Sequence, residues 1–509
     1  MESPFKPACL LMSGRALGFA ASFLIPLVLV RIFDQAEFGT YKQLFLIYST
    51  AYGIAQCGMA ESLFYFLPLA PREAGRYVLN ALLALAGAGL VCLAFLWGGG
   101  PTISRWLGNP ELSEQIPLIG TYLLLMLAAT VLEIVMISRK RFAWAASSYA
   151  LSDLMRAALY LAPVLLLRRL EWLLFGAVAF AALRLCMTLA YIRYEFPGNL
   201  RPDPALFKIQ LGYALPFELA VVVETIQANF HQYAVSYHFD ATTFAIYSVG
   251  CLQIPLVEFI GASVANVMMV RMAEELREDH PEAVLAMWRD TTRKLALVFL
   301  PLVGLLLVNA REIIVFLFTQ RYLASVPVFR IWSLAIALSV LTTDAVLRVY
   351  AQTRFLFLLN MVRLLLIAGS IHWFLSTFQL PGAVLVTLFA TLVAKGWAVA
   401  RVKRLMHVEP SDILPWRGLA AISAVAALAS LPVLGIKSVV DAPAWFLLVI
   451  TGLVYVASYL ALVYGSGILS RSERLAIAAW VQRWHGPVAG TEGIQGGARG
   501  MEPVPARKE

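Results

Sequence analysis

Long hydrophobic segments, separated by short polar stretches, follow one another along almost the whole chain. Each is roughly 20 residues long, the length that an α-helix needs to cross about 30 Å of bilayer hydrocarbon. We therefore predict an all-α, polytopic membrane protein with about 14 transmembrane helices. Their predicted positions are 9–30, 44–67, 77–98, 116–137, 147–167, 172–191, 211–236, 241–270, 295–310, 329–347, 355–376, 382–400, 418–436 and 443–465.

The two ends of the chain differ from its hydrophobic body. The first segment carries Arg15 and is not followed by a small-residue cleavage site, so we expect it to remain as a membrane span. Residues 471–484 contain Leu475, Ile477, Trp480, Val481 and Trp484 among basic residues, a composition that predicts an amphipathic helix on the bilayer surface. From Gly486 onward, glycine, proline and charge predict disorder.

The composition narrows the class of protein further. Hydrophobic residues make up 60% of the chain and charged residues 14%, a balance outside the range of soluble domains. The five cysteines lie in or beside predicted spans without paired spacing, so we expect them to pack rather than to form disulfides. We expect no metal site and no cofactor.

Basic residues gather in alternate loops, and this pattern predicts the orientation. With the N-terminus inside, the basic clusters at 139–141, 193–208, 271–294 and 401–417 all fall in cytoplasmic loops. Such an excess is typical of the cytoplasmic side, so both termini are predicted to be cytoplasmic. The net charge of +9 then reflects loops that face anionic membrane lipids, and it does not indicate a nucleic-acid partner.

A short segment occurs twice in the chain. FDQAEFGTY at 33–41 returns 206 residues later as FDATTFAIY at 239–247, with Phe, Asp, Phe and Tyr at matching positions. A second pair, SDLMR at 152–156 and LNMVR at 359–363, is separated by 207 residues. Chance resemblance between two loop-to-helix junctions is the alternative, but the nearly equal separations favour an internal duplication.

The duplication predicts two parallel lobes, because the even number of spans between the copies gives them the same orientation. Parallel repeats are a transporter architecture in which substrate passes between the halves during alternating access. Asp34 and Asp240 are expected to cap the helices that follow, while Phe38 and Phe244 pack back on the bundle. The predicted units are an N-terminal six-helix lobe at 1–191, a cytoplasmic linker at 192–210, a C-terminal six-helix lobe at 211–402, two additional helices at 403–465, and an amphipathic helix with a tail at 466–509.

Several short motifs carry a family resemblance. They are RIFDQAEFGTY after the first span, YALP at 213–216, FAIYSVG at 244–250, and PLVEFIGASVANVMMVRMAEEL at 255–276. In these motifs the chain resembles the polysaccharide (Wzx-type) flippases of the multidrug/oligosaccharidyl-lipid/polysaccharide (MOP) exporter superfamily.

The resemblance implies a two-lobed transporter in the inner membrane of a bacterium. It would move lipid-linked oligosaccharide, usually on polyprenyl diphosphate, to the outer face for surface polysaccharide synthesis, with polysaccharide polymerase machinery as a further partner. The same superfamily contains the lipid II flippase, which also has two additional C-terminal spans, and the drug/cation antiporters. The fold alone therefore does not determine the substrate.

Charged residues inside the predicted spans are candidate site residues, because a charge at mid-bilayer costs roughly 2.5–3.5 kcal/mol without a partner or water. A diphosphate favours arginine, whose forked donors match phosphate oxygens. Our candidates are Arg15, Arg156 and Arg363. Their alternative role is ion pairing with the acidic residues Glu133, Asp153 or Asp344. The basic residues nearer span ends, which we expect to extend toward the interface, are Arg184, Arg330 and Lys395.

The seventh span has a polar face. Its members follow steps of three and four residues: Tyr213, Pro216, Ala220, Glu224, Gln227 and His231. Lipid cannot satisfy such a face, so it must line a cavity or pack on polar groups of another helix. We predict that Gln227 and His231, together with Tyr52 and Gln56 of the second span, contact the substrate.

Directed transport also needs an energy source, which carboxylates supply when they bind H⁺ or Na⁺ in one conformation only. Glu224 and Glu258 fit that role best, followed by Asp344 and Glu61. Asp344 has an alternative partner in Arg348, one helical turn away. The sequence leaves the ion open.

Two other functions remain as alternatives: a polytopic enzyme acting on lipid-linked sugars, and a drug/cation antiporter. The sequence contains no GxxxxGK[ST], HExxH or DxD motif, and its predicted loops are too short for a catalytic domain. We therefore expect a nonenzymatic transporter. The basic residues inside the spans favour an anionic substrate over a cationic one.

Overall fold

The computed structural model describes residues 23–469 and 473–474, and these form helices joined by turns and loops. Among these described residues, eleven helices are long and apolar enough to cross a membrane, or up to 12 if the bent pair Pro204–Pro216 and Glu218–His238 is a single span. The predicted all-α, multi-pass class is therefore confirmed.

Some predicted features lie outside the described residues. Of the first span, the structure describes a helix at Phe23–Ile32, and Arg15 precedes the described part. The amphipathic helix predicted at 471–484 falls almost entirely in the part that is not described, as does the tail.

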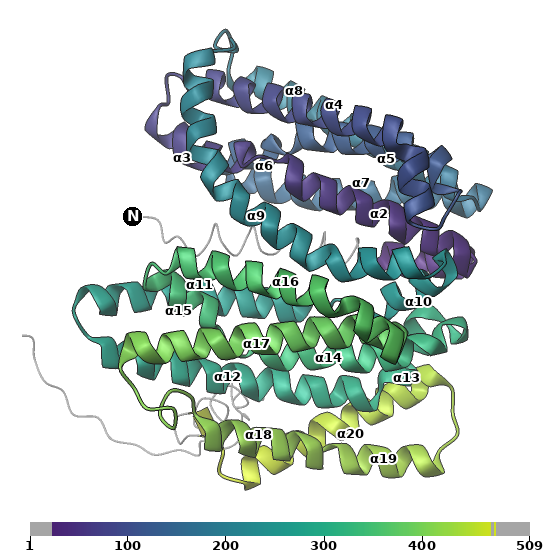
Figure 1. The fold of residues 1–509 in the computed structure, drawn as a ribbon, viewed down its shortest axis with the longest axis vertical. Coiled ribbons are helices and arrows are strands. Elements are labelled where there is room, and N and C mark those ends of the chain that lie inside the picture. Colours follow the sequence, from purple (N-terminus) through teal and green to yellow (C-terminus); the bar gives the residue numbers. More distant parts are fainter. Residues whose placement is uncertain (1–22, 470–472, 475–509) are drawn as a thin grey trace, which may run out of the picture. The chain divides into compact units, whose positions relative to one another are not determined.

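The N-terminal lobe consists of α2 to α8 (Figure 1). Their bounds are α2 Gln35–Ala55, α3 Met59–Leu69, α4 Ala74–Trp106, α5 Leu112–Ala129, α6 Val131–Ser138, α7 Phe142–Leu167 and α8 Leu170–Glu195. The lobe buries one ion pair, in which Arg184 Nη2 lies 2.7 Å from Glu133 Oε2, and Glu133 is only 2% exposed. Arg184 also donates to Ser152 Oγ at 2.6 Å. The expectation that Arg184 extends to the interface is thus wrong, because a buried carboxylate compensates its charge inside the lobe.

The C-terminal lobe consists of α10 to α17, and three further helices follow it. The bounds are α10 Ala241–Gly250, α11 Pro255–Arg277, α12 Pro281–Val308, α13 Ala310–Phe318, η1 Gln320–Ser325, α14 Val326–Ser339, α15 Thr343–Val349, α16 Thr353–Phe378, α17 Leu380–Met406, α18 Trp416–Leu428, α19 Ser430–Val439 and α20 Ala444–Gly465. Figure 1 shows α16 and α17 running side by side.

Several spans that the sequence predicts as continuous are broken in the structure, among them the segment at 44–67, which is interrupted between Ala55 and Met59. The segment at 241–270 is interrupted between Gly250 and Pro255, since proline lacks an N–H group and disfavours a helical residue before it. The segment at 329–347 is interrupted between Ser339 and Thr343. Breaks of this kind free backbone carbonyls that need other partners in a membrane, and they occur where such groups face protein or a water-filled cavity.

Helix α9, Pro204–His238, joins the two lobes. The region expected as a linker, 192–210, contains the end of α8, a non-helical stretch at 196–203 and the first turns of α9. Asp203 caps α9 and its carboxylate lies 3.2 Å from Arg76 of α4. The first half of α9 contacts the N-terminal lobe, where Gln210 donates to Ser62 at 2.8 Å. Its second half contacts both lobes: Val235 belongs to the same buried cluster as Ile367 of α16 and Val384 of α17, and Ser236 accepts a hydrogen bond from Gln43 of α2.

The two copies of the repeated segment have the predicted local structure. Asp34 accepts from the backbone N–H of Glu37 at 2.8 Å, and Asp240 accepts from that of Thr243 at 3.0 Å. The phenylalanines that follow, Phe38 and Phe244, are fully buried. Capping and inward packing are therefore confirmed for both copies.

The copies also contact each other. A Cβ on Gly39 of α2 would lie 1.9 Å from the carbonyl oxygen of Ala241, so the backbones touch there. Gln43 Nε2 donates to Ser236 Oγ at 2.7 Å, and Gln35 Nε2 donates to the carbonyl of Arg321 at 2.8 Å. The repeats thus form a contact between the lobes at the ends where α2 and α10 begin.

Candidate functional site

Three neighbouring cavities lie along the C-terminal lobe and α9. We name them by one lining residue each: the Lys395 cavity of about 540 Å³, the His231 cavity of about 550 Å³, and the Arg348 cavity of about 120 Å³. Of the residues that the structure describes, Arg363 of α16 is the one that lines all three. The Arg363 side chain therefore lies where the three cavities adjoin one another.

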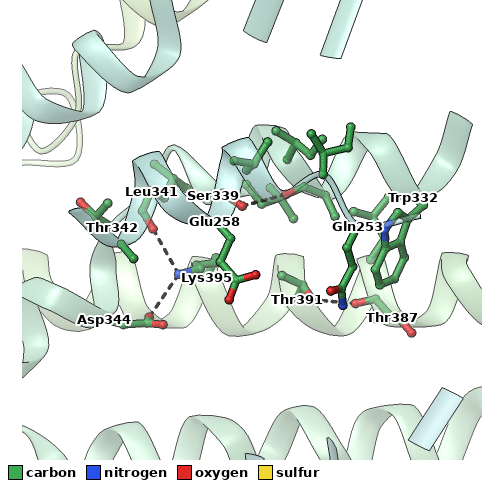
Figure 2. A pocket seen from close by; sticks show the side chains of 18 of the residues that line it. Gln253, Glu258, Trp332, Ser339, Leu341, Thr342, Asp344, Thr387, Thr391 and Lys395 are labelled. Carbon is green, nitrogen blue, oxygen red and sulfur yellow. Dashed lines mark hydrogen bonds and ion pairs between the residues drawn. The ribbon is translucent and has the colours of Figure 1, made fainter. Parts of the chain in front are cut away.

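The Lys395 cavity lies between α11, α14 and α17 (Figure 2). Lys395 Nζ donates at 3.1 Å to the carbonyl of Leu341, in the break between α14 and α15, and at 3.1 Å to Asp344. Figure 2 shows Glu258 pointing into the same hollow. The expectation that Lys395 extends to the interface is wrong, because a freed carbonyl and a carboxylate hold it inside. The ion pair that the structure gives Asp344 is with Lys395 rather than with Arg348.

The polar face of the seventh span lines the His231 cavity. Gln227 and His231 are 3% and 2% exposed, whereas Glu224 is exposed, and all three line this hollow. His231 Nδ1 and the hydroxyl of Tyr247 share a hydrogen bond of 2.6 Å. Of the two readings of the polar face, the structure therefore supports cavity lining for its C-terminal half.

Arg363 differs from Lys395, whose ammonium group is held in an ion pair with Asp344. It forms no hydrogen bond or ion pair with any side chain in the described part of the chain, and its Nε is buried without a partner. Its guanidinium group is thus available to a ligand. An anion that entered any of the three cavities would meet this group.

A family model described as polysaccharide biosynthesis protein matches residues 28–327, which is more than half of the 509 residues. The chain belongs to the polysaccharide biosynthesis protein family. No curated protein matches it by sequence. The match includes the whole N-terminal lobe, α9 and the repeat contact.

Solved structures show the same fold in the MOP superfamily. The chain is similar to a lipid II flippase, MurJ, in an inward closed conformation, at 13% identity and a TM-score of 0.69, covering 91% of this chain and 98% of that one. An inward-facing multidrug resistance MATE transporter matches at 17% identity and 0.57, covering 79% and 96%. A MOP transporter from Pyrococcus furiosus matches at 14% and 0.53, covering 79% and 97%. At these identities the likeness shows the fold alone, and it agrees with the predicted two-lobed architecture.

For this member of the polysaccharide biosynthesis protein family, the other predicted site residues lie away from the three cavities. Arg156 pairs with Asp153, one of its three alternative partners, within α7. The hydroxyl of Tyr52 shares a hydrogen bond of 2.7 Å with Thr130, and Gln56 ends α2. The fourth carboxylate of the ion-coupling set, Glu61, is exposed in α3. Substrate contact by Arg156, Tyr52 and Gln56, like that by Arg15, and ion coupling by Glu61 stay predictions.

Three cavity residues were not predicted from the sequence. Lys42 of α2 lines the His231 cavity. Gln253 and Trp332 line both larger cavities. The sequence does contain one indication for Gln253, which lies two residues before Pro255 in a hydrophobic segment. A proline breaks the helix there, and a polar side chain at such a break can face the substrate pathway. Lys42 gave no signal, because its position depends on how the lobes meet.

Proposed function

We propose that this protein is a flippase that translocates lipid-linked oligosaccharide, carried on polyprenyl diphosphate, across a bacterial inner membrane by alternating access. The observation that carries the proposal is the position of Arg363, without a hydrogen bond or ion pair among the described residues, at the meeting point of three cavities. A diphosphate supplies the oxygens that such a guanidinium group binds. The membership in a polysaccharide biosynthesis family supports this substrate class.

The charge of the cavities supports an anionic substrate over a cationic drug. The basic residues that line them are Lys42, Arg348, Arg363 and Lys395. The acidic residues are Glu224, Glu258 and Asp344. Four basic side chains against three acidic ones leave the lining with a small positive excess, and one acidic charge is already taken by Lys395. A cation antiporter needs the opposite balance.

The sugar part of the substrate needs polar and aromatic surfaces as well as a cation. The two larger cavities offer them through Gln227, Gln253 and Trp332, which can donate to, accept from or stack on sugar rings. We assign ion coupling, by H⁺ or Na⁺, to Glu224 and Glu258, whose carboxylates face these cavities. Asp344 is a weaker candidate for ion coupling, because its carboxylate already forms an ion pair with the ammonium group of Lys395. Polysaccharide polymerase machinery would act on the product.

Translocation in proteoliposomes tests the proposal directly. The probe is a polyprenyl diphosphate that bears a fluorescently labelled oligosaccharide, and a membrane-impermeant quencher reports how much label crosses the bilayer. We expect the wild-type protein to accelerate crossing and Arg363→Gln to slow it by about 10-fold or more, the loss of one charge-assisted contact. The matched control is Arg354→Gln, an exposed position on the same helix, which should leave the rate unchanged.

The outcomes separate the alternatives. Wild-type protein that leaves the lipid probe in place but transports an organic cation would support the antiporter instead. Equal rates for wild type and Arg363→Gln would remove Arg363 from the site even if the lipid crosses.

A further inference from the structure

The His231 cavity is lined by matching positions of the two repeats. Three pairs of lining residues are separated by 206 residues, the same distance that separates the two copies of the repeated segment. The pairs are Phe23 with Asn229, Pro26 with Gln232, and Lys42 with Ser248.

The structure supports this alignment, since the helix before the first copy ends at Ile32 and α9 ends at His238, again 206 residues apart. Likewise, α2 begins at Gln35 and α10 at Ala241. Because no insertion separates these elements, the pairs occupy equivalent places in the two copies. When equivalent positions of parallel repeats face one cavity, the axis that relates the repeats passes through it.

The two sides of this cavity differ in charge. The first copy contributes Phe23, Pro26 and Lys42, whereas the second contributes only neutral polar residues at the matching places. Lys42 is therefore a single cation, supplied by the N-terminal lobe beside the axis. The other basic residue of the cavity, Arg363, comes from the C-terminal lobe.

Lys42 has no acidic partner in the described part of the chain. Its ammonium group lies 5.5 Å from the ring centre of Phe38 and 5.6 Å from that of Tyr41, both on its own helix. Ring faces attract a cation, but they do not neutralise it. Among the described residues that line this cavity, Glu224 is the only one with a carboxylate. Two cations thus share a membrane-embedded cavity with one carboxylate, an arrangement that an anionic ligand would stabilise.

We propose that Lys42 and Arg363 form a two-cation site for the phosphate groups of the transported lipid, with one cation supplied by each lobe. The proposal rests on the proposed function and extends it, since it assigns a substrate contact to the N-terminal lobe next to the repeat contact. Because the two cations belong to different lobes, the bound phosphates would link the lobes while the Gly39–Ala241 contact is closed.

Binding measurements on the full-length protein in nanodiscs test this site. The probes are polyprenyl diphosphate, the matching uncharged polyprenol, and inorganic diphosphate as a competitor. We expect Lys42→Gln to weaken binding of polyprenyl diphosphate by about 10- to 100-fold, as removal of a charge-assisted contact does, and to leave polyprenol binding unchanged. Lys42→Arg should retain most of the affinity. The matched control, Lys208→Gln at an exposed position of α9, should behave as wild type.

Each other outcome overturns a defined part of the argument. If Lys42→Gln weakens polyprenol and polyprenyl diphosphate equally, Lys42 acts by packing and the charge assignment is wrong. If Arg363→Gln weakens diphosphate binding and Lys42→Gln does not, the two-cation site is wrong while the flippase proposal stands. If the wild type does not prefer the diphosphate over the polyprenol, both proposals are wrong. Competition by inorganic diphosphate alone, without a contribution from the lipid chain, would identify a site for a soluble anion and overturn the lipid assignment.

Discussion

Replacing Gly39 with alanine perturbs the contact between the two copies of the repeated segment. The added Cβ would lie 1.9 Å from the carbonyl oxygen of Ala241, whereas ordinary contacts begin near 3.4 Å. Backbone atoms cannot rotate away as a side chain can, so α2 and α10 must separate by roughly 1.5 Å, the difference between these two distances. We therefore expect Gly39→Ala to disfavour the state in which this end is closed.

The size of the effect follows from the cost of overpacking. Forcing an extra methyl group into a packed contact costs about 1–3 kcal/mol, and the same free energy shifts a two-state equilibrium by about 5- to 150-fold. An alternating-access transporter has a second state, open at this end, that relieves the clash. We expect Gly39→Ala to populate that open state. Transport should then be slower, because the return to the closed state becomes unfavourable in free energy.

Distance measurements between two nitroxide labels report the shift. Suitable positions are Ala36 and Arg321, both exposed and close to the hydrogen bond between Gln35 and the Arg321 carbonyl. The label distance should lengthen in Gly39→Ala. The matched control is Gly87→Ala in α4, where an added Cβ meets nothing within 4 Å. An unchanged distance distribution in a folded Gly39→Ala protein would refute the reasoning.

Three further predictions concern stability. Glu133→Gln leaves Arg184 buried without its partner and should lower the free energy of unfolding by about 3–5 kcal/mol in a thermal unfolding assay, while the additional change Arg184→Gln should restore much of it; no recovery would contradict the pairing. The pKa of Asp203 lies below its usual value because backbone N–H groups in the first turn of α9 donate to the carboxylate. The contribution of Asp203 to stability is therefore present above its unfolded-state pKa of about 4, and it is lost as the pH falls through the lower folded-state pKa. Asp203→Asn should flatten the acid side of the curve of melting temperature against pH, and coincident curves would count against it. Asp34→Ala and Asp240→Ala should each cost about 0.5–2 kcal/mol as lost helix caps, and melting temperatures equal to wild type would show that the caps are dispensable.

Features that depend on local sequence were predictable. Segment length predicted the all-α, multi-pass class, because a helix must be long enough to cross the hydrocarbon, but the described residues contain 11 or up to 12 such helices rather than about 14. The residue types of the repeated segment gave the caps at Asp34 and Asp240 and the inward packing of Phe38 and Phe244. The polar face of the seventh span pointed to Glu224, which lines two of the three cavities. In each case, a few residues that are close together in the sequence determine the feature.

Features that depend on which helices become neighbours were not predictable. Arg184 and Glu133 lie 51 residues apart, and nothing in either segment selects the other as a partner. Lys395 is held by the carbonyl of Leu341, which is free only because the chain breaks between α14 and α15. The place of Lys42 in a cavity likewise requires the lobes to meet as they do. Pairing and cavity lining are properties of the assembled bundle, and one sequence without its fold contains them only implicitly.

The repeated segment separates the needs of folding from those of transport. The positions that are identical in the two copies cap a helix or pack inward, as Asp34 and Phe38 do in the first copy. The next position in each copy faces the cavity on the axis, and there the copies differ, with Lys42 in one and Ser248 in the other. A duplicated fold needs the same caps and core contacts twice. A substrate with one phosphate-bearing end does not need the same cation in both copies, and Lys42 and Ser248 differ at a position that faces the proposed phosphate site.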